Sequence, residues 1–277
     1  MQAVRSGYSH AMTTVADSSL DFVRLRDLLG ASAGRFDVDH VAVCDSTNTR
    51  LLERAQRGSG SGTVLVADAQ TAGRGRRGRT WVSAPGSSLS FSLLWRFPAA
   101  QRLEGLSLAV GLAIVRGLGK LGATGLALKW PNDIWLNGRK LGGVLVEVAQ
   151  GARGEWATVI GIGLNLRAQP EWVEQIAQPF AALDELSQQA PDREAVLAAI
   201  LEALLEVLTQ FSSHGFVAFV DGWMSYHALL GADVSVEQHG LKRYGRCGAV
   251  DALGRLTVDT PEGEMHVFGG EVSLRAT

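Results

Sequence analysis

Two long segments with apolar residues at helical spacing flank a run of short strand patterns, and this arrangement restricts the fold more than any other feature. Residues 103–121 and 192–211 carry apolar side chains three and four positions apart, and Asp192 is a suitable N-cap for the second segment. An apolar stripe on a helix has to be buried, so we expect both helices to cover one face of a shared sheet. The strands expected between them, in a mixed or antiparallel sheet, are residues 126–130, 134–136, 140–148 and 158–166.

The patterns at the two ends divide the chain into three regions. Residues 1–35 form a short lead-in, which is polar up to about residue 19 and then contains one helix over residues 20–29. Residues 36–228 form the main domain, and residues 229–277 carry strand patterns about ten residues apart, typical of a small SH3-like β-barrel. The remaining elements expected are a helix over residues 47–57 and strands over residues 41–44, 63–67, 89–95, 233–237, 245–250, 255–260 and 264–268.

Composition excludes several classes of protein. With 277 residues, 46% of them apolar, the chain can bury a core without disulfides or metals. Cys44 and Cys247 lie far apart with no metal-ligand spacing, so a reducing, cytoplasmic location is expected. A formal net charge of -2 gives no general attraction to nucleic acid or to anionic membrane. We expect no membrane-spanning segment, and a lead-in too short for a helix-turn-helix domain.

The strongest chemical signal is a loop rich in glycine and arginine, Gly73-Arg74-Gly75-Arg76-Arg77-Gly78-Arg79. Glycine lets the backbone approach a ligand closely, and guanidinium groups bind phosphate oxygens with paired hydrogen bonds. Each such charge-assisted bond contributes about 1.5–3 kcal/mol where water is excluded. The loop therefore predicts a site for a phosphate-containing ligand such as a nucleotide.

Arginine-glycine runs also occur in disordered RNA-binding segments, which is the main alternative for this loop. Here the run lies between a predicted strand at 63–67 and an apolar stretch at 81–95, rather than in a tail. The Walker A pattern GxxxxGK[ST] does not occur in the chain, which argues against a P-loop kinase or ATPase.

Four shorter clusters could complete a ligand site, although each one alone is also compatible with an ordinary turn or strand. Ser46-Thr47-Asn48 follows the first predicted strand, where it equally suits the N-cap of the next helix. The other three combine polar groups with a proline turn or with glycines that admit a ligand. They are Lys129-Trp130-Pro131-Asn132-Asp133, Arg139-Lys140-Leu141-Gly142-Gly143 and Gly161-Ile162-Gly163-Leu164-Asn165.

In chain order these clusters, with Gln70-Thr71-Ala72 before the arginine loop, resemble the signature set of the biotin-protein ligases. The resemblance covers residues 40–277, including residues 268–275, which are similar to the family's C-terminal module. It implies an α+β fold with a class II synthetase-like central sheet, helices on one face, and a C-terminal SH3-like barrel. Some members carry an N-terminal DNA-binding domain, whereas this chain resembles the ligase-only form, so no DNA or membrane partner is expected.

The resemblance implies a ligase that uses biotin and ATP, with Mg²⁺ accompanying the ATP and no metal bound by the protein alone. It would form biotinyl-5′-AMP and transfer biotin to a lysine of the biotin carboxyl carrier protein of a carboxylase. A homodimer through the central sheet is compatible with the resemblance. The implied catalytic residues are Arg76, Lys140, Arg79 and Asp133, with Asp133 or Lys129 orienting the acceptor amine. The implied biotin-binding residues are Ser46, Thr47, Asn48, Gln70, Gly73, Arg74, Gly75, Arg76, Lys140 and Gly143. The implied nucleotide-binding residues are Arg74, Arg76, Arg79, Trp81, Lys129, Asn132, Lys140 and Asn165.

Two other functions remain open from the residues. A lipoate- or octanoyl-transferring enzyme would share the scaffold, but the arginine-glycine loop argues against it. A non-catalytic RNA-binding protein would use the loop and leave the clusters at Lys140 and Asn165 unexplained.

Overall fold

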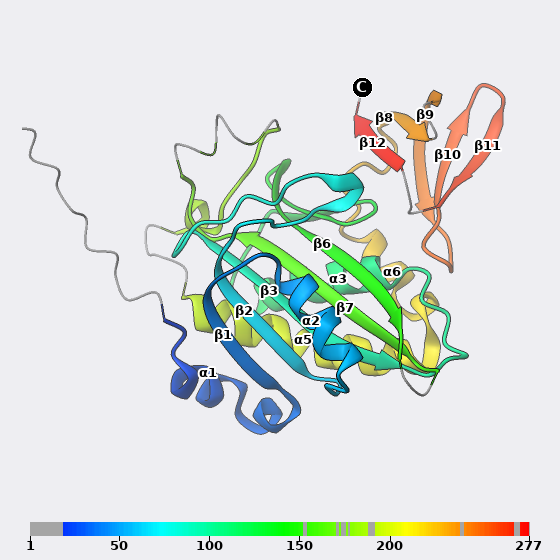
Figure 1. Ribbon diagram of the computed structural model, residues 1–277. Helices are drawn as coiled ribbons and strands as arrows, with labels where there is room; N and C mark the ends of the chain where they lie inside the picture. Colours follow the sequence, from blue (N-terminus) through cyan, green and yellow to red (C-terminus); the bar gives the residue numbers. More distant parts are fainter. Residues whose placement is uncertain are drawn as a thin grey trace, which may run out of the picture.

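The computed structural model describes residues 19–151, 154–169, 172, 176, 178–187, 192–238, 241–268 and 272–276. The polar part of the predicted lead-in, up to residue 18, lies outside the described residues. The described chain forms a central sheet with helices on both faces and a second, smaller sheet at the C-terminal end (Figure 1).

The central sheet has seven strands in the order β1-β2-β3-β7-β6-β5-β4. β1 and β2 are parallel, and every other neighbouring pair is antiparallel, so the sheet is mixed as expected. The strand patterns predicted this sheet with ends displaced by a few residues, most at the start of β1, where charged side chains obscure the alternation. The strands are β1 (Asp37–Cys44), β2 (Thr63–Gln70), β3 (Ser88–Phe97), β4 (Leu126–Lys129), β5 (Asp133–Leu136), β6 (Arg139–Gln150) and β7 (Trp156–Asn165).

The two long helices pack on one face of this sheet, as their apolar periodicity predicted. α3 (Leu106–Lys120) and α5 (Arg193–His214) contact each other and form the main core with the sheet (Figure 1). Asp192 caps α5 by accepting a hydrogen bond from the Ala195 amide at 3.0 Å. Gly117 admits the backbone of α5, because a Cβ there would lie 2.8 Å from the Ala199 carbonyl oxygen.

α5 is also the one described helix long and apolar enough to cross a membrane, with a mean hydropathy of 1.7 over its best window. This is a criterion of length and composition alone, which a buried core helix also meets. Most of the window is buried against α3 and β3, so the protein's own core accounts for its apolar character.

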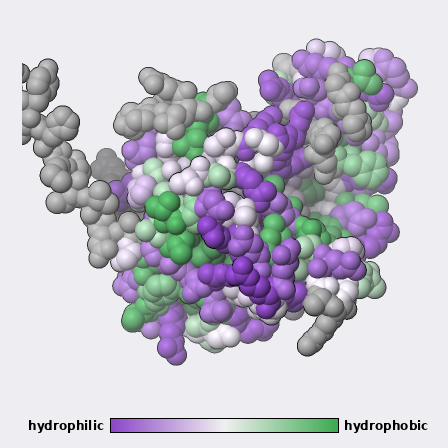
Figure 2. Space-filling view, viewed as in Figure 1, coloured by the Kyte–Doolittle hydropathy of each residue, from purple (hydrophilic) through white to green (hydrophobic). Residues whose placement is uncertain are grey.

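α2 (Thr47–Gln56) lies on the opposite face of the sheet, a position that periodicity alone did not predict (Figure 1). It buries Leu51 and Ala55 against Leu65, Leu94 and Val159 in a separate apolar cluster. Hydrophilic residues cover its outer side (Figure 2). α2 covers only part of this face, and the remainder is lined by small residues.

Short elements complete the main domain. α1 (Phe22–Leu29) packs against α5, and Arg24 pairs with Asp192. At the start of α5, Arg193 lies 2.7 Å from the buried carboxylate of Asp68, which also contacts His40 at 2.9 Å. This charge cluster fixes the N-terminus of α5 to the sheet. The remaining short helices are η1 (Gly30–Arg35), η2 (Arg76–Gly78), η3 (Leu183–Leu186), η4 (Phe216–Phe219) and α6 (Val220–Met224).

The C-terminal sheet is antiparallel, with the strand order β11-β10-β9-β8-β12. Four of its strands follow the predicted patterns, whereas β12 was quoted only within a family motif. Its buried residues join the core of the main domain, and Trp130 Nε1 donates to the Gly254 carbonyl at 3.0 Å across the junction. The strands are β8 (Asp233–Gln238), β9 (Leu241–Val250), β10 (Leu256–Thr260), β11 (Gly263–Val267) and β12 (Val272–Ala276).

Candidate functional site

The uncovered part of the α2 face has a floor of serine and glycine. Directly paired residues in antiparallel strands point to the same face, and Ser90 pairs with Gly163 while Ser92 pairs with Gly161. On the other side of β7, Gly143 pairs with Gly163. A Cβ at Gly163 would overlap the Trp81 ring. These small residues leave room above the sheet for a ligand and for the side chains that surround it.

At one end of the floor, the start of α2 is joined to β2 and β3 by hydrogen bonds. Gln70 Oε1 accepts from the Thr47 amide at 2.8 Å and lies 3.3 Å from the Thr47 hydroxyl. Ser92 Oγ lies 2.7 Å from Thr47 Oγ1 and 2.6 Å from Asn48 Oδ1. Ser46 is the N-cap residue, as one alternative expected, but its side chain makes no capping hydrogen bond. The helix therefore does not use the Ser46 hydroxyl as its N-cap acceptor.

The arginine loop is a short closed structure above this floor. The Gly75 amide donates to the Arg79 carbonyl at 2.7 Å, and the Trp81 amide donates to the Gly73 carbonyl at 2.9 Å. Arg77 at the tip has φ 58°, in the left-handed region. Packing requires glycine at position 73. A Cβ there would lie 3.4 Å from the Gln70 side chain and even closer to a backbone oxygen atom.

Two arginines of the loop reach the sheet. Arg74 Nη2 lies 2.8 Å from Glu147 Oε2 on β6. Arg76 Nη1 donates to Asn132 Oδ1 at 3.1 Å, in the turn between β4 and β5. Asn132 is held in turn by its own donation to the Val144 carbonyl at 2.9 Å.

The β4–β5 turn brings further charges to the same place. Lys140 Nζ lies 2.7 Å from Asp133 Oδ1, and both side chains are mostly buried. Lys129 Nζ lies 5.0 Å from the centre of the Trp135 ring, within cation–π distance. The Trp130–Pro131 peptide bond in this turn is cis.

Burial alters the protonation equilibria of two cations in this group. It lowers the pKa of the Arg76 guanidinium, opposed by the charge of Asp133, while nearby arginines lower it further. It also lowers the pKa of the Lys129 ammonium, again opposed by Asp133, with added lowering from Lys140 and Arg275. Arg275 is on β12, so the C-terminal sheet contributes positive charge to the site. An anion bound here would relieve the mutual repulsion of these cations.

Asn165 ends β7 at the other end of the floor. Its amide nitrogen donates to the Ala181 carbonyl at 2.9 Å. Its Oδ1 is buried and has no hydrogen-bond partner among the described residues. A buried acceptor without a donor is costly, so this oxygen fits a ligand that brings an N–H or O–H group.

The structure thus assembles all the predicted site residues along one face of the sheet, although their roles remain predictions. Sequence reasoning missed Glu147, Ser90 and Ser92. Ser90 accepts from Trp81 Nε1 at 3.1 Å. The available signals were a single carboxylate within an apolar strand, and serine at the three alternate positions Ser88, Ser90 and Ser92 of β3.

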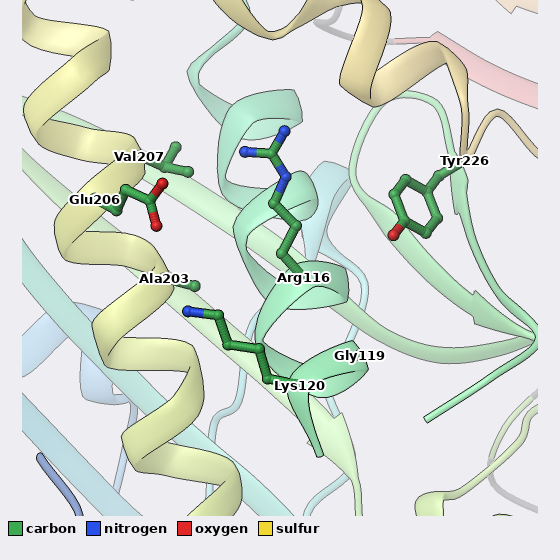
Figure 3. Close-up of a pocket in the computed structure, with 7 residues that line it drawn as sticks. All are labelled: Arg116, Gly119, Lys120, Ala203, Glu206, Val207 and Tyr226. Carbon is green, nitrogen blue, oxygen red and sulfur yellow. The ribbon is translucent and has the colours of Figure 1, made fainter. Parts of the chain in front are cut away.

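A cavity of about 570 Å³ lies elsewhere, on the helix-covered side of the protein (Figure 3). It includes no predicted site residue. Within the described residues, no group of three or more His, Cys, Asp or Glu side chains could hold a metal ion. The lining residues of the cavity are Arg116, Gly119, Lys120, Ala203, Glu206, Val207 and Tyr226.

Comparison with known proteins gives consistent matches over most of the chain. Residues 41–165 match the model of the biotin/lipoate A/B protein ligase family. The chain is 36% identical to a biotin-[acetyl-CoA-carboxylase] ligase of Mycobacterium tuberculosis, over 91% of this chain and 95% of that protein. It is 35% identical to the bifunctional ligase/repressor BirA of Escherichia coli, over 88% of this chain and 76% of that protein.

The fold agrees with solved structures. A biotin protein ligase from Aquifex aeolicus, in complex with biotin and ATP, superposes with a TM-score of 0.76 and 32% identity, over 87% of this chain and 99% of that one. These matches cover most of the chain, and the arginine loop and the lysine and asparagine clusters lie together in the structure. The chain belongs to the biotin/lipoate A/B protein ligase family.

Proposed function

We propose that this protein activates biotin with MgATP to biotinyl-5′-AMP and then transfers biotin to a lysine of a biotin carboxyl carrier protein. The observation that carries the proposal is the group of cations around Arg76 and Lys140, held above a serine-glycine floor. The relative and the solved structure named above, a biotin ligase and a biotin–ATP complex, support this choice of acid.

In the first half-reaction, the biotin carboxylate attacks the α-phosphorus of ATP, and pyrophosphate leaves. Negative charge then increases on the non-bridging oxygens, and Arg76 and Lys140 are placed to neutralise it. Arg79 at the end of the loop would help to hold the phosphates. The Mg²⁺ ion arrives as part of the substrate MgATP.

The adenosine end would lie toward Trp81 and Asn165. Trp81 packs over Gly163 and leaves an aromatic surface beside the floor. Asn165 Oδ1 needs a hydrogen-bond donor, which an adenine amino group or a ribose hydroxyl would supply.

In the second half-reaction, an acceptor lysine amine attacks the mixed anhydride and releases AMP. The amine has to arrive neutral, and the mutual repulsion of cations around Lys129 disfavours a further ammonium. Asp133, on the same turn, is suited to orient the amine or accept its proton, while its ion pair with Lys140 keeps the carboxylate in position.

Biotin-dependent exchange of pyrophosphate into ATP tests the acid, the nucleotide and the adenylate together. We expect exchange with biotin and none with lipoate or octanoate. Exchange that depends on lipoate would favour the other branch of the family. Absence of exchange, with salt-sensitive RNA binding, would favour the RNA-binding alternative.

The identity of the acceptor and the assembly are further proposals. We infer a carrier protein of acetyl-CoA carboxylase as acceptor, because the ligase from M. tuberculosis carries that name. A homodimer through the central sheet, a cytoplasmic location and the lack of DNA binding remain expectations. Light scattering and an operator-binding assay with the full chain would test two of them.

A further inference from the structure

The residue Glu147, which the function proposed above does not use, closes a chain of hydrogen bonds beneath the arginine loop. Its Oε2 accepts from Arg74 Nη2 and from Asn48 Nδ2, both at 2.8 Å. Asn48 Nδ2 also donates to the Leu145 carbonyl at 3.2 Å. Asn48 Oδ1 faces Ser92 at 2.6 Å, and Ser92 leads on to Thr47.

The chemistry of these groups fixes the orientation of the Asn48 amide. A carboxylate and a backbone carbonyl only accept hydrogen bonds, so the amide nitrogen has to face Glu147 and Leu145. The amide oxygen therefore faces Ser92, which must donate its hydroxyl proton to it. Asn48 is 3% exposed, so water cannot easily replace these partners.

This orientation determines the direction of the next hydrogen bond. Ser92 has one proton, and Asn48 Oδ1 uses it. The contact between Ser92 Oγ and Thr47 Oγ1 then takes the proton of Thr47, because it is shorter, at 2.7 Å, than the 3.3 Å contact of Thr47 Oγ1 with Gln70 Oε1. Thr47 consequently directs its lone pairs, and no proton, toward the open side of the pocket.

Gln70 is oriented by the same end of α2. Its Oε1 accepts the Thr47 amide proton at 2.8 Å, which leaves its amide nitrogen as a donor. A ligand with an N–H group and a carbonyl side by side matches this acceptor and this donor. The cyclic urea of biotin has that pattern.

We propose that Glu147 is a positioning residue that sets the direction of hydrogen bonding in the biotin pocket, so that Thr47 accepts from a ureido N–H. The inference rests on the proposed function. Gly161 provides the space for this chain, because a Cβ there would overlap the Asn48 amide.

The test measures biotin-dependent ATP–pyrophosphate exchange by the full-length protein and its variants. In Glu147→Ala the KM for biotin should rise roughly three- to tenfold, the effect of one misdirected hydrogen bond, while kcat and the KM for ATP change by less than about twofold. Desthiobiotin, which keeps the urea, should show the same rise. A biotin analogue methylated on the ureido nitrogen should show none, because it cannot use the Thr47 acceptor. Glu104→Ala, in an exposed Arg–Glu pair outside the site, is the matched control and should match wild type.

A second variant distinguishes the direction of the hydrogen bonds from the negative charge of Glu147. Glu147→Gln can still present a carbonyl oxygen to Asn48 and Arg74, which are both donors, so the KM for biotin should stay near that of wild type. A rise equal to that of Glu147→Ala would mean that the charge pair with Arg74 matters instead, and would overturn the proposal.

A double mutant tests the relay even if Glu147→Ala folds poorly. Ser92→Ala removes the hydroxyl between Asn48 and Thr47 and should raise the KM for biotin by a similar factor. Adding Glu147→Ala should then have no further effect on this KM, whereas multiplied effects would refute the relay. If wild type itself shows no biotin-dependent exchange, the proposed function fails; if it does and Glu147→Ala matches it, only this inference fails.

Discussion

The arginines of the loop between β2 and β3 are held in three different ways. Arg74 is paired with Glu147, and Arg76 is bonded to Asn132. Arg77 is exposed at the tip with a left-handed backbone. Neighbouring arginines of the loop therefore have different contacts. Removing the charge of one arginine should have a different effect from removing the charge of another.

Replacing Arg76 by alanine should cause early release of the acyl-adenylate. The variant loses the loop cation that is hydrogen-bonded to Asn132, so the intermediate is held less tightly and escapes before transfer. We expect biotinylation of lysines on a bystander protein to rise relative to the carrier domain. Arg77→Ala, at the exposed tip, is the control and should retain selectivity. Retained selectivity in Arg76→Ala would contradict this assignment.

Lys129 should make the stability of the protein vary with pH in the alkaline range. Burial lowers its pKa in the folded state, so the unfolded chain binds more protons at this residue between the folded and unfolded pKa values. Stability from this group therefore rises with pH through that window. The Tm of wild type minus that of Lys129→Met, measured by thermal unfolding, should increase as the pH rises toward the ordinary lysine pKa of about 10.4. A difference independent of pH would contradict the lowered pKa.

At the scale of elements, the site exists because β3 and β7 have small residues on one face and large apolar residues on the other. Phe91 and Leu93 are fully buried beneath α3 and α5, whereas Ser90 and Ser92 face the site. One strand thus serves the core and the ligand pocket through simple alternation.

Gly161→Ala should damage both binding and stability. The added Cβ overlaps the Asn48 amide, so Asn48 must shift, at a cost of about 1–3 kcal/mol. We expect weaker biotin binding by calorimetry and a lower midpoint of denaturant unfolding. Gly119→Ala is the matched control, since nothing lies near its Cβ, and it should stabilise α3 by up to about 1 kcal/mol. Equal effects of the two substitutions would be inconsistent with the packing described.

The sequence predicted the elements well because their apolar periods are strong. It also singled out clusters rich in glycine, proline and arginine that the structure brings to one face of the sheet, although their roles as ligand sites stay predictions. It could not place α2 on the far face, since Leu51 and Ala55 fit either side of a sheet. It also could not identify Glu147 or Ser92. Their importance arises because β7 pairs with β3 on one side and with β6 on the other, and local patterns carry no information on that register.

At the scale of the whole molecule, the two sheets behave as one packed body. His227 and Cys247 meet at the junction at 3.7 Å. Burial lowers the pKa of His227 to about 4 and raises the pKa of the Cys247 thiol to about 11, so both are neutral at pH 7. Neither side chain therefore changes its charge near neutral pH.

Gly254 combines a left-handed backbone with close packing against the main domain, so it should be sensitive to substitution. Its φ is +74°, and a Cβ there would lie 2.8 Å from the Gly105 Cα atom of the main domain. Gly231 has the same φ of +74° but no atom closer than 3.9 Å, so it matches the backbone strain without the clash. Gly254→Ala should lower Tm more than Gly231→Ala, and should weaken the Trp130 hydrogen bond across the junction. Equal Tm values would show that the junction can adjust.

The chain that connects the two sheets runs alongside β4 before it enters β8. The Leu128 amide donates to the Tyr226 carbonyl at 2.7 Å, and the Ala228 amide donates to the Leu128 carbonyl at 2.9 Å. This border of the central sheet is thus already occupied by the protein's own backbone. β1, at the opposite border, has no neighbouring strand beyond it within the described residues. A second polypeptide that lengthens the sheet by main-chain pairing would therefore have to join at Asp37–Cys44, on the side away from the C-terminal sheet.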